Sequence, residues 1–217
     1  MNISIPCNTQ NYGGLRAGPV EYIVIHYTAG KGDSAQANGK YFAREVVGAS
    51  AHWFIDEHDT VLSVPEQFVA WHCGGAAYKH PKCRNSNSLG VELCSEMGAD
   101  GTYYFTEATL ENAKMKVQQL MEQYHVPVEN VLRHYDVTGK LCPAPFIGVG
   151  ADAWNEFKGG LTMYKNMEAV PDWAKPTIQK VVDSGALRGD ENGNLNLSND
   201  LTRTLVILDR MGAFDNK

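Results

Sequence analysis

Three side chains that could bind a metal stand in two parts of the chain. His26 ends the apolar run in "EYIVIHYTAG", and His134 and Cys142 lie in "RHYDVTGKLCPAP". Imidazole nitrogen and thiolate sulfur are preferred ligands of zinc, and three protein ligands leave a fourth position open for catalysis. Bound zinc lowers the pKa of water to about 7 and polarises a carbonyl group. These residue types predict a hydrolytic zinc site, but their spacing leaves the other histidines open as candidates: His52, His58, His72, His80 and His125.

The segment at residues 133–145 is predicted to be a loop. Gly139, Pro143 and Pro145 interrupt it too often for a regular helix or a central strand. Loops that are held on a rigid scaffold often carry chemistry. Such a loop would present one candidate ligand from each end, with the positive charge of Lys140 between them.

The surrounding pattern predicts alternating strands and helices. Short β-branched or alternating apolar runs indicate strands, and helical spacing with a capping residue indicates helices. Strands are expected at 22–25, on both sides of a turn at 57–59, at 89–94 and close to 131–133, and helices from Asp33 or Ser34 through Val47, after Thr106, and over "DAWNEFKGG". This order predicts an α/β fold for roughly the first 160 residues.

Five stretches of the chain resemble the type 2 N-acetylmuramoyl-L-alanine amidases, zinc enzymes related to the peptidoglycan recognition proteins. They follow the family's order and extend over nearly all of residues 1–160: "VIHYTAG" (24–30), "SAHWFID" (50–56), "VAWHCGG" (69–75), "NSNSLGVEL" (85–93) and "RHYDVTGKLCPAP" (133–145). The resemblance implies a mixed central sheet flanked by helices. It also implies hydrolysis of the amide between N-acetylmuramic acid and L-alanine in peptidoglycan.

The resemblance also implies roles for individual residues. His26, His134 and Cys142 match the three zinc ligands. Glu92 matches the acidic residue that takes a proton from the attacking water and passes it to the leaving amine. Lys140 matches a lysine whose charge can stabilise the oxyanion of the tetrahedral intermediate.

Three further residues are expected near the substrate. His72 matches a histidine that lines the substrate groove, and Trp71 and His52 are expected to bind substrate beside it. His52 could instead support a zinc ligand or pack in the core, and Asp136 is another candidate for such support. Some relatives have a catalytic tyrosine where this chain has Ala51, which places the acid–base work on Glu92.

The expected domains are a catalytic domain at 1–160, a linker at 161–170 and a small helical domain at 171–217. The last of these resembles a single S-layer homology motif, which implies binding to a secondary cell-wall polymer, and dimerisation is the alternative. Two apolar faces are predicted there, one with Trp173, Ile178, Val181, Val182 and Leu187, and one with Leu201, Leu205, Leu208 and Met211.

Composition limits the partners and the location. The 217 residues carry a net charge of −6, with no basic stripe for nucleic acid and no apolar run long enough for a membrane anchor. The first residues lack the features of a signal peptide, so we expect a cytoplasmic protein that reaches the cell wall through a separate pore-former. Five cysteines do not suggest a disulfide framework, but pairing of Cys73 with Cys83 stays open.

These observations predict a zinc-dependent amidase of the phage or prophage endolysin type. A host autolysin is the alternative origin. Two other functions remain as rivals: a peptidoglycan-recognition module without activity, and a zinc peptidase that cuts stem peptides. Such modules typically lack the cysteine ligand, and Cys142 is present here.

Overall fold

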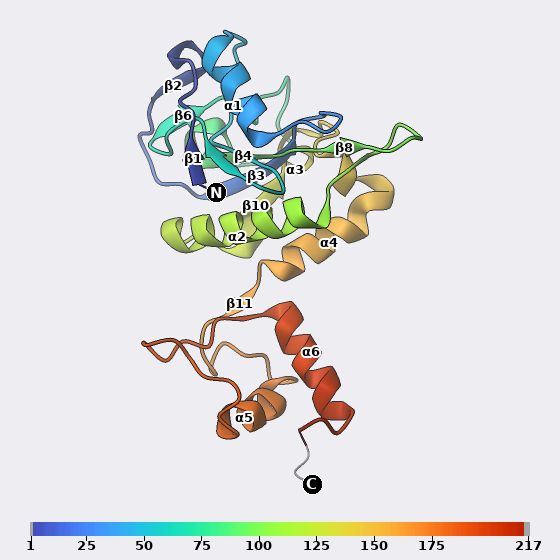
Figure 1. The fold of residues 1–217 in the computed structure, drawn as a ribbon. Helices are drawn as coiled ribbons and strands as arrows, with labels where there is room; N and C mark the ends of the chain where they lie inside the picture. Colours follow the sequence, from blue (N-terminus) through green and yellow to red (C-terminus); the bar gives the residue numbers. More distant parts are fainter. Residues whose placement is uncertain (1, 215–217) are drawn as a thin grey trace. The chain divides into compact units, whose positions relative to one another are not determined.

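The computed structural model describes residues 2–214 (Figure 1). The chain forms two compact units, and the boundary between them in the sequence falls between Asn155 and Glu156. Within residues 2–214, every helix is too short or too polar to cross a membrane.

The first unit contains a six-stranded mixed sheet with helices on its faces, which confirms the predicted fold class. In spatial order its strands are β1 (Asn2–Ser4), β5 (Thr60–Leu62), β4 (Trp53–Ile55), β7 (Ser88–Leu93), β3 (Tyr22–Tyr27) and β10 (Val131–Arg133). Only the β4–β5 pair of this sheet is antiparallel, and the turn between these two strands is the one predicted at 57–59. The neighbouring strands β4, β7, β3 and β10 therefore all run in the same direction, and β10 forms one edge of the sheet.

Helix α1 (Ala35–Arg44) packs against β4 and β5, and Figure 1 shows it on the opposite side of the sheet from α2. The side chain of Ser34 caps its first turn, as predicted. The helix ends three residues before the predicted Val47. The reason is tertiary: the buried Asn11 side chain donates to the carbonyl of Glu45 and accepts from the backbone N–H groups of Val47 and Gly48.

Helix α2 (Glu107–Tyr124) contacts β3, β4 and β7 from the other side. Thr106 caps it as predicted, and the apolar residues Ala113, Val117 and Leu120 are buried. Burial of this stripe is what binds a helix to a sheet, since helix propensity alone contributes little.

Shorter elements complete the first unit. They are β2 (Tyr12–Leu15) paired with β6 (Phe68–Ala70), β8 (Glu96–Met97) paired with β9 (Tyr103–Tyr104), α3 (His134–Thr138), the start of α4 (Ala151–Gly160), and the 3-10 turns Thr9–Asn11, Asn85–Asn87, Val128–Asn130, Ala144–Phe146 and Gly148–Gly150.

A core cluster joins α3 to β3 and to the loop after β6: Tyr22, Val24, Cys73, Cys83 and Val137. In this cluster Cys73 and Cys83 are fully buried free thiols that contact each other.

The second unit contains β11 (Met163–Tyr164), α5 (Lys175–Asp183), β12 (Leu197–Ser198) and α6 (Asn199–Arg210). The domain that was predicted to be helical, 171–217, contains α5 and α6 as its helices within the described residues. Residues 161–170, predicted as a linker, instead belong to this unit: β11 pairs with β12, and Val170 is in its core. The predicted apolar face of α6 is also wrong in part. Thr202 and Val206 are the buried positions of α6, while most of the predicted face is exposed: Leu201, Leu208 and Met211.

Candidate metal centre

The carboxyl ends of three neighbouring parallel strands hold the candidate site. His26 is the fifth residue of β3, and Glu92 lies beside it as its register partner on β7. Both side chains leave the sheet on the same face because paired residues of adjacent strands point the same way. His134 follows directly after β10, the neighbour of β3 on the other side.

Cys142 lies beside these residues because the chain reverses direction after α3. The segment that contains α3 was predicted to be a loop, so this helix is a correction. The five-residue helix forms because the Asp136 carboxylate accepts the backbone N–H of Arg133 at 2.9 Å and caps its start. Gly139 ends it in the left-handed conformation at φ 86°, which glycine adopts without strain. The chain then reverses, and the N–H of Tyr135 donates to the carbonyl of Cys142 at 2.8 Å.

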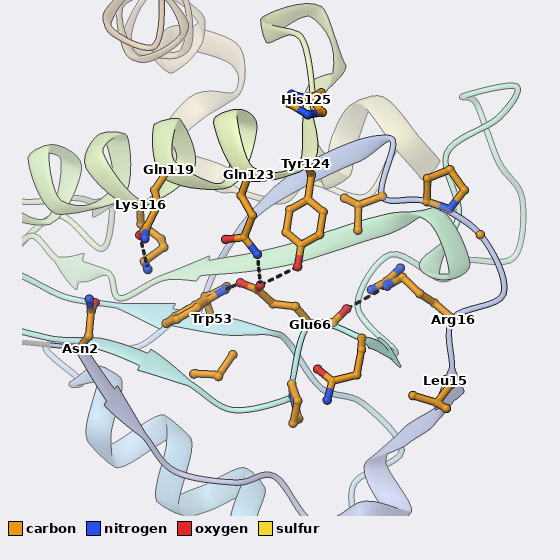
Figure 2. Close-up of a pocket in the computed structure, with 16 residues that line it drawn as sticks. Asn2, Leu15, Arg16, Trp53, Glu66, Lys116, Gln119, Gln123, Tyr124 and His125 are labelled. Atoms are coloured by element: carbon orange, nitrogen blue, oxygen red, sulfur yellow. Dashed lines mark hydrogen bonds between the residues drawn. The ribbon is translucent and has the colours of Figure 1, made fainter. Parts of the chain in front are cut away.

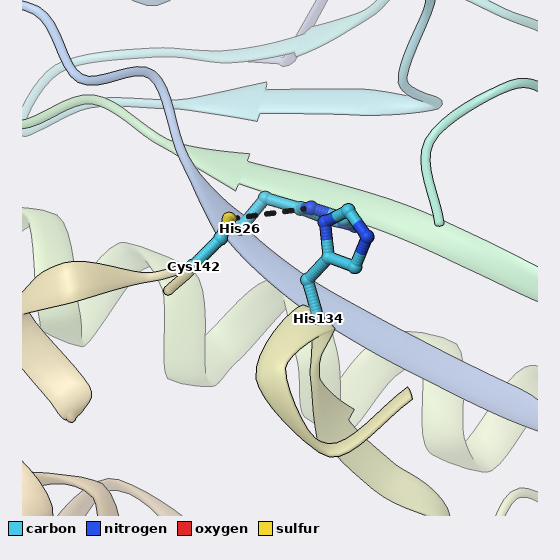
Figure 3. A group of neighbouring side chains, drawn as sticks. All are labelled: His26, His134 and Cys142. Atoms are coloured by element: carbon cyan, nitrogen blue, oxygen red, sulfur yellow. Dashed lines mark hydrogen bonds between the residues drawn. The ribbon is translucent and has the colours of Figure 1, made fainter. Parts of the chain in front are cut away.

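His26, His134 and Cys142 form a buried group whose potential ligand atoms all lie within 4.8 Å of one another (Figure 3). The Cys142 Sγ is 3.6 Å from the His26 Nδ1. Among the described residues, neither ring nitrogen of His134 meets a partner with good hydrogen-bond geometry, although the Gly74 carbonyl is close enough to interact with the ring. A buried imidazole with unsatisfied nitrogens beside a thiol and a second imidazole fits a metal ion, and this donor set suits zinc.

The electrostatics keep both imidazoles neutral. Burial, together with the neighbouring histidines, lowers the pKa of His26 well below its usual value. Burial and the charge of Lys140 lower the pKa of His134 to about 4. Burial raises the pKa of the Cys142 thiol to about 12 in the metal-free protein. The two rings can therefore offer lone pairs, but the sulfur must lose a proton before it binds a metal.

Glu92 is the acidic group of the site. Its Oε2 atom is buried and has no hydrogen-bond partner among residues 2–214. Desolvation raises the pKa of this carboxyl group to about 8, against the opposing charge of Lys140. Lys140 is exposed, yet its charge reaches Glu92, His26 and Cys142, so the loop brings a cation to the same place.

His72 contacts the group directly. Its Nδ1 is 3.1 Å from the Nε2 of His26, and its Nε2 is 3.1 Å from the Oγ of Ser88. Trp71, by contrast, is 38% exposed and lies next to Gly13 on β2. Asp136, considered as a support for a ligand, forms its ion pair with Arg133 at 2.8 Å.

For His52, where substrate binding was expected and core packing was the alternative, the surroundings match core packing. The residue is fully buried, its Nδ1 accepts the Gly90 N–H at 2.9 Å, and its Nε2 lies 3.2 Å from the Phe68 carbonyl. Both ring nitrogens thus have partners inside the protein, and Nε2 also lies 3.0 Å from the Arg16 guanidinium. The centroid of the His52 ring is 5.7 Å from that of the His72 ring. His52 is part of the scaffold that holds His72.

Ser88 and Gly90 were not predicted from the sequence as parts of the site, although both lie in the stretch at 85–93. With Glu92 they occupy every second position of β7, so all three face the same side of the sheet as His26. This alternation was the available signal.

A separate groove of about 920 Å³ lies at the other end of these strands (Figure 2). Its central carboxylate, Glu66, accepts from Trp53 at 2.8 Å and from Tyr124 at 2.7 Å, and Gln123 also donates to it. The metal-binding candidates are not among the residues that line it. Because the Glu66 bonds join Trp53 of β4 to Gln123 and Tyr124 of α2, they serve the packing of α2 on the sheet.

A sequence-family model described as N-acetylmuramoyl-L-alanine amidase matches residues 16–145, which include every residue of the metal-binding group. The chain belongs to the N-acetylmuramoyl-L-alanine amidase family.

Individual members of the amidase family are similar over different lengths. A probable N-acetylmuramoyl-L-alanine amidase of Bacillus licheniformis is 35% identical over 159 residues, which are 68% of this chain and 43% of that protein. The N-acetylmuramoyl-L-alanine amidase BlyA of Bacillus subtilis is 31% identical over 205 residues, 87% of this chain and 54% of BlyA. The chain thus spans about half the length of these relatives.

A solved structure supports the same fold. A mutant endolysin from Bacillus subtilis superposes with a TM-score of 0.61 at 26% identity, and the match covers 75% of this chain and 99% of that one. The match to nearly the whole of that chain agrees with a mixed sheet that is flanked by helices.

Proposed function

We propose that this protein is a zinc-dependent amidase that hydrolyses the bond between N-acetylmuramic acid and L-alanine in peptidoglycan. The observation that carries the proposal is the buried group of His26, His134 and Cys142, set beside Glu92 in a chain of the amidase family. The names of the relatives, which are N-acetylmuramoyl-L-alanine amidases, supply the substrate.

His26, His134 and Cys142 would hold the metal through two neutral nitrogens and one thiolate. When bound, zinc supplies a Lewis acid that polarises the amide carbonyl and acidifies a water molecule. The choice of zinc follows from the nitrogen and sulfur donors, since oxygen ligands would be needed for calcium or magnesium. Three protein ligands also match the count of a catalytic site with an open position.

Glu92 is proposed as the acid–base residue. In its ionised form the carboxylate accepts a proton from the attacking water, and it then returns that proton to the nitrogen of the leaving L-alanine. A pKa near 8 in the metal-free protein suits both directions of transfer near neutral pH. The position fits as well, because Glu92 shares its face of the sheet with the ligand His26.

Lys140 is proposed to stabilise the negative charge that develops on the carbonyl oxygen. Its charge already acts on Glu92 and on the three metal-binding candidates. A preorganised cation at such a point typically contributes more in the transition state than in the ground state. Trp71, which is partly exposed next to His72 in the chain, is proposed to contact the glycan or peptide.

We also propose an endolysin role, in which the enzyme degrades the wall of a bacterium from within after a separate pore-former opens the membrane. The likeness to a Bacillus subtilis endolysin structure supports this role, and a host autolysin is the alternative. The second unit, with its exposed apolar residues on α6, is proposed to bind a wall polymer or a second copy of the chain.

The test combines zinc content with product analysis on purified cell walls, for wild type and for Cys142→Ser. We expect about one zinc per chain, as one ligand set predicts, and release of L-alanine amino termini, with both lost in the variant. Release of amino termini from other residues would assign a peptidase instead. Wall binding without any new amino termini, with zinc present, would make the protein a recognition module.

A further inference from the structure

A continuous hydrogen-bonded chain leads away from His26 into the body of the protein. The Nε2 of His26 is 3.1 Å from the Nδ1 of His72, and the Nε2 of His72 is 3.1 Å from the Oγ of Ser88. The hydroxyl of Ser88 in turn donates to the backbone carbonyl of Arg84 at 2.7 Å. The free end of the chain is the Nδ1 of His26, which faces the Cys142 sulfur.

The last bond sets the direction of all the others. A carbonyl oxygen can only accept, so the single proton of Ser88 is committed to Arg84. Ser88 must therefore accept from His72, whose Nε2 carries the proton. The Nδ1 of a neutral His72 is then an acceptor, and His26 must donate to it through Nε2. This leaves the Nδ1 of His26 with a lone pair directed to the metal-binding group.

We propose that His72 is a positioning residue: with Ser88 it holds His26 in the tautomer and orientation in which Nδ1 binds the metal. His72 thus acts on the reaction through His26. The inference rests on the proposed metal site and deepens it, because it explains how one ligand is prepared before the metal arrives. Partners of this kind fix the ring of a ligand and raise its basicity.

The surroundings of His72 are shaped for this position. The Asn85 side chain accepts hydrogen bonds from the backbone N–H groups of His72 and Cys73, at 3.2 and 2.8 Å. These two bonds fix the backbone that carries the His72 side chain. Gly90 provides the space for the ring, because a Cβ atom there would lie 2.5 Å from the Cγ of His72. A side chain that is fixed at its backbone, its ring and both ring nitrogens loses little further entropy when the metal binds.

The experiment measures zinc affinity by competition with a chromogenic chelator, for wild type and five variants of the full chain. His72→Ala removes both contacts of the ring. His72→Asn can keep an acceptor near the Nδ1 position, whereas His72→Gln places its amide near Nε2 and loses that acceptor. Ser88→Ala removes only the far end of the chain. His58→Ala, at a histidine whose side chain is 78% exposed, is the matched control.

We expect His72→Ala and His72→Gln to bind zinc about 10- to 100-fold more weakly, which is the usual effect of losing such a partner. Ser88→Ala should lose less, His72→Asn should recover most of the affinity, and His58→Ala should match wild type. The melting temperatures of the metal-free forms identify any variant that is simply less folded. In the cobalt-substituted proteins, the absorption bands should shift for His72→Ala and return for His72→Asn.

Unchanged zinc affinity in His72→Ala, together with a raised KM for a soluble muramyl peptide, would overturn the inference and make His72 a substrate contact. Equal losses in His72→Asn and His72→Ala would also overturn it, because the acceptor would then be irrelevant. Failure of wild type itself to bind zinc would reject the metal site, and the wild-type titration separates that failure from the others.

Discussion

The ring of His72 lies directly against the backbone of Gly90, on the face of β7 that also carries Ser88 and Glu92. An added Cβ at Gly90 would meet the Cγ, Nδ1 and Cβ atoms of His72 at 2.5, 2.8 and 2.9 Å. The ring cannot stay in place beside such a group. The small residue on the strand and the polar chain from His26 to Ser88 therefore depend on each other.

Gly90→Ala is expected to displace His72, which costs about 1–3 kcal/mol of stability as overpacking and weakens zinc binding as His72→Ala does. Chemical denaturation and the chelator competition measure the two effects. In a His72→Gly background all three close atoms are gone, so Gly90→Ala should there cost much less. An equal cost in both backgrounds would show that the strand itself, and not His72, requires glycine.

Glu92→Gln should lower the rate of amide hydrolysis by about 10²- to 10⁴-fold, the usual contribution of a general acid–base group. The amide keeps the size of the side chain but cannot accept the proton. Zinc content should stay at the wild-type level, which release assays and metal analysis on the same sample would show. A variant that retains full activity would remove Glu92 from the mechanism.

The stability of the metal-free protein should fall with rising pH because of Glu92. The folded-state pKa is about 8, above the ordinary 4.5, so the folded protein holds this proton more tightly than the unfolded chain does. Below about pH 4.5 the group is protonated in both states; stability falls between pH 4.5 and 8, and the full cost, on the order of a few kcal/mol, is present above pH 8. Relative to wild type, chelator-treated Glu92→Gln should gain stability across this window, and a constant difference in urea denaturation would contradict the shift.

Zinc uptake at pH 7 should release protons. Burial raises the pKa of Cys142 to about 12, so the sulfur is a thiol before the metal binds and must become a thiolate. The histidines are already neutral and contribute none. In Glu92→Gln, where the carboxyl group cannot contribute either, calorimetry in buffers of different ionisation enthalpy should give about one proton. A heat that is independent of the buffer would show that Cys142 does not bind as a thiolate.

Arg16 should be a stabilising residue away from the metal-binding group. Its guanidinium donates to the carbonyls of Glu66, Ser86, Phe68 and Ser88 at 2.9–3.1 Å. Lysine has fewer donors and no planar fork, so Arg16→Lys should leave some of these carbonyls unpaired and cost at least about 2 kcal/mol. The exposed Arg44→Lys is the matched control, and equal unfolding midpoints for the two variants would contradict this role.

The sequence was sufficient for the features that depend on local pattern. Apolar runs and capping residues predicted the main strands and helices, including Ser34 and Thr106 as caps. The residue types of His26, His134 and Cys142 indicated metal chemistry, and the five motifs identified the family that the profile match confirms. These features can be read from single positions or from a short period, so they need no knowledge of long-range contacts.

Other features were decided only by the tertiary structure. The helix after His134 forms through a side-chain cap, the end of α1 is set by Asn11 from another segment, and residues 161–170 join the second unit through a strand pair. His52 and His72 are both histidines inside motifs of the family, yet His52 bonds to the backbone of Gly90 whereas His72 contacts His26. A side chain's partners depend on strand order and register between segments distant in the chain, and no local periodicity contains that information.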